Sequence, residues 1–181
     1  MFDPTAFDNM KVIIEGALYD LDLSGDIVIT DRNDIVNLAK MSRSFEISFR
    51  LADGSVSTKL ELKSKLVNLA AELLPNSLPE QFAGSYVRLQ FFLEHAEILS
   101  EFQTIESIFF TIWGEKRKII QSVEYNPLNK PRKIKNVITI DFERIINEEQ
   151  MDDLMEMTEF MVTTLEHLQA FVDDRKKGVK E

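Results

Sequence analysis

The sequence contains no cysteine among its 181 residues. Disulfides, thiolate nucleophiles and zinc sites with cysteine ligands are therefore excluded. The six glycines occur singly, so the sequence has no glycine-rich loop of the kind that binds nucleotide phosphates. It also has no serine in the pattern of a hydrolase nucleophile elbow. We therefore expect no cofactor and a function that is not catalytic.

Long apolar runs and targeting signals are also missing. No apolar run approaches the roughly 18 residues that a membrane-spanning helix needs. The N-terminus, MFDPTAFDNM, lacks the basic segment and apolar stretch of a secretory signal. Both observations predict a cytoplasmic protein that has no contact with a membrane.

Basic residues are fewer than acidic residues in this sequence. The 21 Lys and Arg residues stand against 31 Asp and Glu residues, which gives a formal net charge of −10. A negative charge of this size disfavours long-range approach to nucleic acid or anionic membrane, so a basic or peptide partner fits better. Hydrophobic residues make up 44% of the chain, enough for one sizeable core.

Apolar periodicity predicts the elements of the first half of the chain. Apolar residues repeat at helical spacing after Asp3, and alternate with polar residues on both sides of the turn ADG. The β-branched run IVIT favours an extended segment. The expected elements are a helix at 3–20 with Asp3 as its N-cap, a strand at 27–30, a short helix at 34–41, a hairpin at 45–63 and a helix at 63–74.

The second half begins after residues 75–85, which hold two prolines and a glycine and mark a possible internal boundary. The final helix has a capping box, formed by Asn147 and Gln150. The expected elements are a strand at 86–95, a hairpin of 107–113 with 118–125, a strand at 133–142, and a long helix from Asn147 to Gly178.

This order predicts an α+β fold, in which an antiparallel sheet with two hairpin-containing lobes is covered by an N-terminal helix, a middle helix and a long C-terminal helix. We expect a single domain over 1–181, with possible lobes at 1–74 and 86–181 joined by 75–85. The order of elements is similar to that of small acidic secretion chaperones, and this resemblance implies a protein-binding role.

The stretch DLDLSGDIVITD, residues 20–31, resembles the calcium loop of an EF-hand, with side-chain oxygens at alternating positions and glycine at the sixth. Its candidate metal ligands are Asp20, Asp22, Ser24, Asp26 and Asp31. The favoured alternative is a helix that ends near Asp20 and turns at Gly25 into a strand. Asp31 is shorter than the glutamate usual at the twelfth position, and no second loop is present to pair with this one.

Basic residues gather between 116 and 135, with Glu124 as the one acid among them. If a hairpin brings the ends of this segment together, they form an anion-binding patch for phosphate or nucleic acid. The patch would contain Lys116, Arg117, Lys118, Lys130, Arg132, Lys133 and Lys135. A solvated loop, or pairing with the acidic C-terminal helix, is favoured because the remaining surface is negative. Nucleic acid is therefore an unexpected partner.

The C-terminal helix has an apolar face wider than a two-residue seam, and it is rich in methionine, which adapts to different partner shapes. A partner or homodimer interface is therefore one expectation for this face, and covering the sheet is the other. The interface candidates are Leu154, Met157, Met161, Leu165 and Leu168.

Another possible metal-dependent site is weaker. Asp53, Glu61 and Lys63 follow the order of a metal-dependent nuclease set, but a tight turn explains Asp53. The leading hypothesis is a cytoplasmic, acidic, non-catalytic module, adaptor-like or chaperone-like, that binds another protein or itself. The alternatives are a metal-binding enzyme or regulator, and phosphate or nucleic-acid binding through 116–135.

Overall fold

Six antiparallel strands and four helices make up the fold in this computed structural model, which describes residues 5–74, 78–128 and 133–178. The helices are α1 (Ala6–Ser24), α2 (Leu66–Leu73), α3 (Leu99–Trp113) and α4 (Met151–Gly178). The strands are β1 (Ile27–Asn37), β2 (Ser42–Leu51), β3 (Ser57–Ser64), β4 (Ser85–Ala96), β5 (Lys118–Glu124) and β6 (Lys133–Ile146). The α+β class predicted from the sequence is therefore confirmed.

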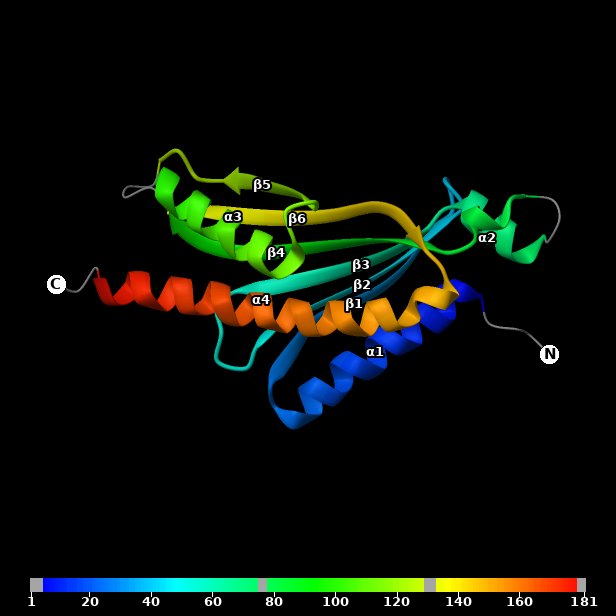
Figure 1. The fold of residues 1–181 in the computed structure, drawn as a ribbon, viewed down its shortest axis with the longest axis horizontal. Helices are drawn as coiled ribbons and strands as arrows, with labels where there is room; N and C mark the ends of the chain where they lie inside the picture. Colours follow the sequence, from blue (N-terminus) through cyan, green and yellow to red (C-terminus); the bar gives the residue numbers. More distant parts are fainter. Residues whose placement is uncertain (1–4, 75–77, 129–132, 179–181) are drawn as a thin grey trace.

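The strands form one sheet in the order β1-β2-β3-β4-β6-β5, and α1, α3 and α4 pack on it (Figure 1). Because β3 pairs with β4, the sheet continues across the two predicted lobes. Strand residues alternate between the core and the opposite face, as in β2, where Phe45 and Ile47 are buried and Glu46 points away. The core lies between the sheet and the three helices.

Helix α1 is longer at its C-terminal end than predicted. Thr5 is its N-cap and accepts a hydrogen bond from the backbone N–H of Asp8 at 3.4 Å. The helix ends at Ser24, not near Asp20, because Gly25 is the first residue in the left-handed conformation, with φ 85°. The predicted N-cap, Asp3, lies outside the described residues.

Helix α4 follows the prediction closely. Asn147 and Gln150 form the expected capping box at the short 3-10 turn Glu148–Gln150, and the helix then runs from Met151 to Gly178. Its buried side faces the sheet, and it lies beside α1 on one flank and α3 on the other (Figure 1). None of the helices that the structure describes is long and apolar enough to cross a bilayer.

Two predicted elements are wrong. The short helix at 34–41 is the end of β1 and a turn, because Ile35 and Val36 pair with β2. The strand at 107–113 is the second half of α3, since Ile105, Phe109 and Trp113 are buried at a spacing of four residues. The sequence SIFFTIW predicted a strand because aromatic and β-branched residues favour strands. Strand β5 consequently forms its hairpin with β6.

Candidate functional site

Helix α1 has apolar side chains on the side that faces away from the core. Its buried residues Phe7, Met10, Ile14 and Leu18 repeat at spacings of three and four. Val12, Gly16, Tyr19 and Leu23 also repeat at spacings of three and four, and helix geometry places them on the opposite side. Val12 is 64% exposed, Tyr19 39% and Leu23 85%. We call these four residues the α1 ridge.

Gly16 lies in the middle of the α1 ridge, in open space. A Cβ atom added there would meet nothing within 4 Å among the described residues. Its backbone is helical, so no left-handed conformation requires glycine at this position. Glycine inside a helix costs about 1 kcal/mol relative to alanine. The fold of this chain therefore gives no reason for glycine here.

Ion pairs along the flank of α1 fix which side of the helix faces outward. Arg43 of β2 pairs with Asp8 at 2.7 Å and with Asp34 of β1 at 2.8 Å, and Lys11 pairs with Asp34 at 2.6 Å. The hydrogen bond from Arg43 is the main cause that lowers the pKa of Asp34 to about 2. A further pair joins Glu15 to Arg32. These contacts hold the α1 ridge away from the sheet.

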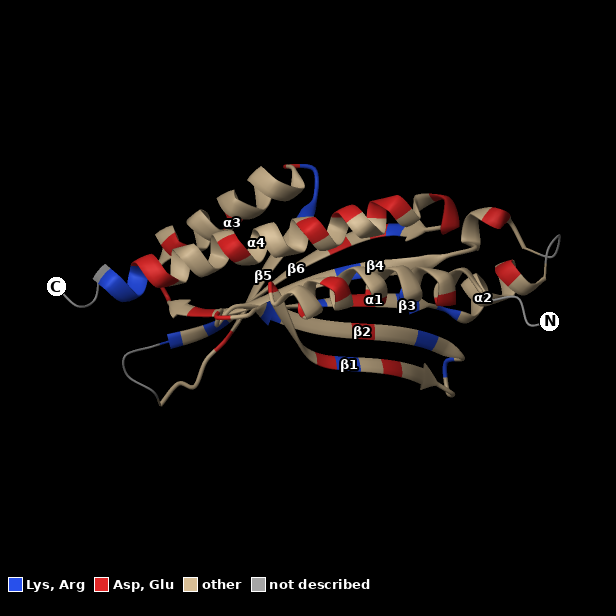
Figure 2. Cartoon of the chain, turned by 90° about the horizontal axis from the view of Figure 1, so that it is seen from below, with Lys and Arg blue, Asp and Glu red and all other residues tan. Residues whose placement is uncertain are grey.

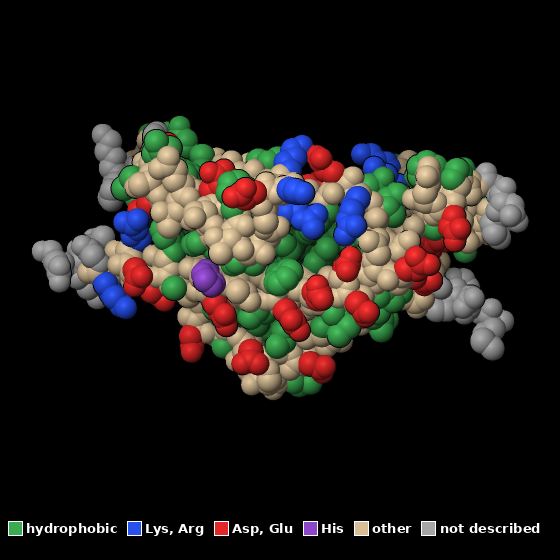
Figure 3. All heavy atoms as spheres, viewed as in Figure 1, with side chains coloured by type: hydrophobic (Ala, Val, Ile, Leu, Met, Phe, Trp, Pro, Cys, Tyr) green, Lys and Arg blue, Asp and Glu red, His purple; other side chains and the backbone are tan. Residues whose placement is uncertain are grey.

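The outer side of α4 differs from the α1 ridge because it has many carboxylates. Between Met151 and Asp174 this helix has seven carboxylates and no Lys or Arg. Among the described residues, one ion pair joins a carboxylate of this stretch to a basic residue outside α4. Arg144 lies 3.5 Å from Asp153. Figure 2 shows the acidic residues along α4 and the basic residues gathered at its C-terminal end. In Figure 3, acidic side chains lie across the surface formed by α4 and α1.

The predicted interface residues lie inside the molecule. Leu154, Met157, Met161, Leu165 and Leu168 are all buried in the core between α4 and the sheet. Their contacts are therefore within the chain in this structure, which is the alternative that the sequence left open. The α1 ridge was not predicted from the sequence. A helical wheel of residues 6–24 shows a second apolar side, but it does not show which of the two sides the sheet covers.

The predicted calcium ligands Ser24 and Asp26 are hydrogen-bonded to each other, but the four aspartates of this set do not form a group that could hold a metal ion. Asp22 accepts a hydrogen bond from the N–H of Ile29 at 3.1 Å, and Ser24 donates to the carbonyl of Leu21 at 2.9 Å. Asp20 lies in α1, Asp26 follows its cap, and Asp31 lies on β1. Within the described residues no group of three His, Asp or Glu side chains could hold a metal ion. The oxygens of 20–31 therefore end a helix and start a strand.

The basic segment is spread along a hairpin. Lys118 lies opposite Asp141, while Lys135 lies opposite Glu124 at the other end of β5. Six residues of strand separate these ends, which is about 20 Å. Lys116 and Arg117 are on the Lys118 side and Lys133 on the Lys135 side, whereas Lys130 and Arg132 lie outside the described residues. The structure does not bring the two groups together.

Charges on the sheet face that points away from the helices are paired. Arg88 bonds Asp141 at 2.9 Å and lies 3.7 Å from Glu61, and Lys118 bonds Glu143 at 2.7 Å. This bond to Glu143 raises the pKa of Lys118. Glu61 and Lys63 belong to this face, whereas Asp53 lies in the turn after β2. Pairs of this kind stabilise adjacent strands.

A buried polar cluster joins β4, α3, β6 and β5. His95 Nδ1 lies 2.8 Å from the carbonyl of Ala96 and 3.1 Å from Glu101 Oε2, and Asn136 Nδ2 lies 3.0 Å from His95 Nε2. Asn136 also donates to Gln121 at 2.8 Å. The imidazole and the carboxylate are both buried. The cluster therefore ties four elements together, although the Oδ1 atom of Asn136 is buried without a hydrogen-bond partner among the described residues.

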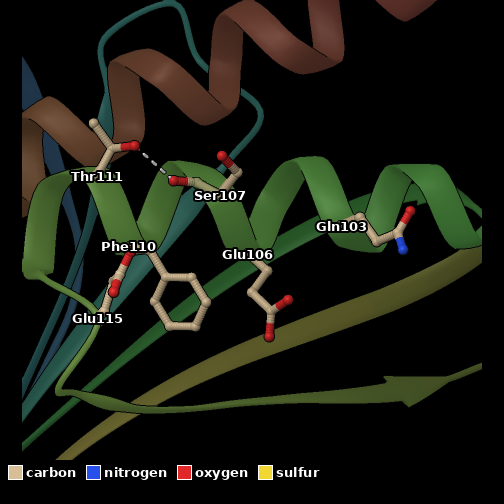
Figure 4. A pocket seen from close by; sticks show the side chains of 6 residues that line it. All are labelled: Gln103, Glu106, Ser107, Phe110, Thr111 and Glu115. Atoms are coloured by element: carbon tan, nitrogen blue, oxygen red, sulfur yellow. Dashed lines mark hydrogen bonds between the residues drawn. The ribbon is translucent and has the colours of Figure 1, made fainter.

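A shallow hollow lies on the outer side of α3 (Figure 4). Its lining residues are Gln103, Glu106, Ser107, Phe110, Thr111 and Glu115. The Thr111 hydroxyl donates to the carbonyl of Ser107 at 2.8 Å, so it bonds its own helix rather than a base. A neighbouring hollow shares part of this lining and includes His167 of α4. Neither arrangement provides a nucleophile bonded to a base.

Comparison with models of known protein families finds no match for this chain. Comparisons with curated proteins and with solved structures also find no match.

Proposed function

We propose that this protein is a non-catalytic protein-binding module and that the α1 ridge is its contact surface. One observation carries the proposal: a helix that already buries a complete apolar side exposes a second apolar side from Val12 to Leu23. That ridge is about 17 Å long, from a rise of about 1.5 Å per residue. Surface helices of globular proteins normally place charged and polar residues there.

The chemistry of the α1 ridge fits a contact between helices. Its side chains are apolar or aromatic, and complete burial of a large apolar side chain contributes about 1.5–3 kcal/mol. Gly16, at the centre, lets a second backbone approach more closely than any other residue would. A ridge of three exposed side chains is a small contact, which supports a reversible complex.

Matched variants test the proposal without knowledge of the partner. In the ridge variant, Val12 and Leu23 are both replaced by glutamine. In the control variant, Val123 and Leu128 are replaced by glutamine; these are 44% and 88% exposed and lie on β5 and the loop after it. The control removes the same two residue types from another part of the surface.

The readout is the set of proteins that each immobilised variant retains from a lysate of the source cells, measured by quantitative mass spectrometry. We expect proteins retained by the wild type and by the control variant to be lost from the ridge variant. Equal retention by the ridge variant and the wild type would contradict the proposal. Self-association, which the sequence also predicts, stays a prediction, and light scattering over a range of concentrations measures it.

A further inference from the structure

The charges that surround the α1 ridge indicate which kind of protein fits it. Helix α1 has four carboxylates and one lysine, Lys11, which pairs with Asp34. Two of these carboxylates are paired as well, Asp8 with Arg43 and Glu15 with Arg32. Helix α4, alongside, has three basic residues, all after its acidic stretch. We infer that the α1 ridge receives a basic amphipathic helix, with the apolar side of that helix on the ridge and its Lys or Arg side chains toward the carboxylates of α4. This inference rests on the proposed function.

The orientation of α4 places carboxylates on the flank nearest α1. The ring of Phe160 packs against Trp113 of α3 at 5.6 Å, and His167 lines the hollow on α3. The flank with Phe160 and His167 therefore faces α3. Helix geometry then places Glu159 and Glu166 toward the other flank, where α1 lies. Apolar and acidic groups therefore occur on neighbouring parts of one surface.

The carboxylates on α4 repel one another. Asp152 and Glu156 are four residues apart, and Glu156 and Glu159 are three apart, spacings at which side chains on a helix interact. Within the described part of the chain, no ion pair joins these three residues to a basic side chain. A basic partner would relieve this repulsion, and complementary charge speeds association.

A second copy of this chain fits the same surface poorly. Each copy has a net charge of −10, and contact between two α1 ridges would bring two acidic helical surfaces together. The sheet face that points away from the helices differs, because its carboxylates pair with neighbouring basic residues. The negative charge without a basic partner thus belongs to α4, which lies beside the helix with the apolar ridge.

The test uses three fluorescent 18-residue peptides and fluorescence anisotropy. The first forms an amphipathic helix with leucine on one side and lysine on the other. In the second, glutamate replaces every lysine. The third contains the residues of the first in scrambled order, so it has the same charge without an apolar side. Each is titrated with the wild-type chain and with four glutamine variants.

The variants separate the apolar and electrostatic contributions. The ridge variant and its control, defined above, change no charge. The α4 variant, Glu159→Gln with Glu166→Gln, removes the two carboxylates that helix geometry places toward α1. Its control, Glu106→Gln with Glu115→Gln, removes two carboxylates from the hollow on α3 in Figure 4. The last two variants have equal net charge, so a difference between them measures local electrostatics.

We expect the lysine peptide to bind the wild type, and the glutamate and scrambled peptides to bind at least tenfold more weakly. The ridge variant should lose at least tenfold in affinity for the lysine peptide and the α4 variant at least threefold. Both controls should change it less than twofold. Raising the salt concentration should weaken binding to the wild type more than to the α4 variant.

Several results would overturn the inference. Equal binding of the lysine and scrambled peptides would show attraction by charge alone. Ridge-dependent binding of the glutamate peptide, or a dimer in light scattering that the ridge variant abolishes, would replace the basic helix with another occupant and leave the proposed function standing. The proposed function would fail as well if no peptide binds and the ridge variant still retains the same proteins from the lysate.

Discussion

Helices α1 and α4 lie next to each other on the same face of the sheet, yet their outer sides differ. Both bury an apolar stripe at helical spacing, and both contribute to one core. The outer side of α4 is mainly acidic, with Glu156, Glu159 and Glu166 exposed beside the half-exposed Met155 and Phe160. The outer side of α1 is the apolar ridge, with Val12 and Leu23 exposed.

The difference shows which surface needs an explanation beyond folding. Solubility accounts for an acidic outer helix side. Neither solubility nor the core accounts for Leu23, which is 85% exposed. They also do not account for Gly16, because a Cβ atom added there would meet nothing within 4 Å in the described part of the chain. These two residues carry the argument for a contact with another protein.

The largest effect is expected on the inner side of α4. Leu165→Ala should lower the free energy of unfolding by about 2–5 kcal/mol, because Leu165 is fully buried and truncation leaves a cavity. Leu23→Ala, on the outer side of α1, should change it by less than about 0.5 kcal/mol. Urea denaturation of both variants measures this contrast. Similar losses would mean that Leu23 belongs to the core.

The next effect concerns the ion pairs that orient α1. The pKa of Asp34 is about 2 in the folded chain, below the ordinary value of 3.8, so its carboxylate stabilises the fold above about pH 4 and this contribution is lost as pH falls from 4 to 2. Asp34→Asn should lower stability at pH 7 by up to about 1 kcal/mol, since the pair is partly exposed to solvent.

The pH dependence provides the control for this prediction. Asp34→Asn should have a shallower loss of stability between pH 4 and 2 than the wild type, measured by chemical denaturation at each pH. Asp174→Asn, which removes a carboxylate exposed near the end of α4, should leave that slope almost unchanged. Equal slopes for the wild type and Asp34→Asn would show that the pairs of Asp34 with Arg43 and Lys11 do not stabilise the fold.

A smaller effect of opposite sign is expected at Gly16. Gly16→Ala should raise the free energy of unfolding by about 0.5–1 kcal/mol, because alanine loses less conformational freedom in a helix and meets no neighbour. Thermal and urea denaturation measure the gain. A loss of stability would show that the helix backbone at this position is strained.

The smallest effect is expected on the outer side of α4. Glu156→Gln should raise stability by about 0.2–0.5 kcal/mol, since it removes repulsion from Asp152 and Glu159. The gain should shrink as salt rises, because these carboxylates are exposed. A gain that does not depend on salt would point to packing instead of charge.

Much of the fold follows from local patterns in the sequence. The alternation around Phe45 and Ile47 predicts β2, and the capping box at Asn147 and Gln150 predicts the start of α4. The misassigned segments have β-branched or aromatic residues whose local preference conflicts with their environment. SIFFTIW is helical because burial of Phe109 and Trp113 on one side outweighs strand propensity.

The candidate site was harder to predict from the sequence, for a physical reason. A helical wheel shows two apolar sides on α1, but it does not show that Met10 and Ile14 face the sheet while Val12 faces solvent. On α4, the sequence pattern of Met161 and Leu165 is typical of interface residues, but in the structure both are buried against the sheet. Which apolar side is left exposed depends on the tertiary packing of the whole sheet.

The measurement that tests the central claim most directly is made on Gly16→Gln. Glutamine is a good helix former, so this variant should be more stable than the wild type in urea denaturation, and its side chain should block close approach to the α1 ridge. We predict increased stability together with loss of the proteins that the wild type retains from a lysate. A variant with increased stability that retains the same proteins in the same amounts would contradict the account.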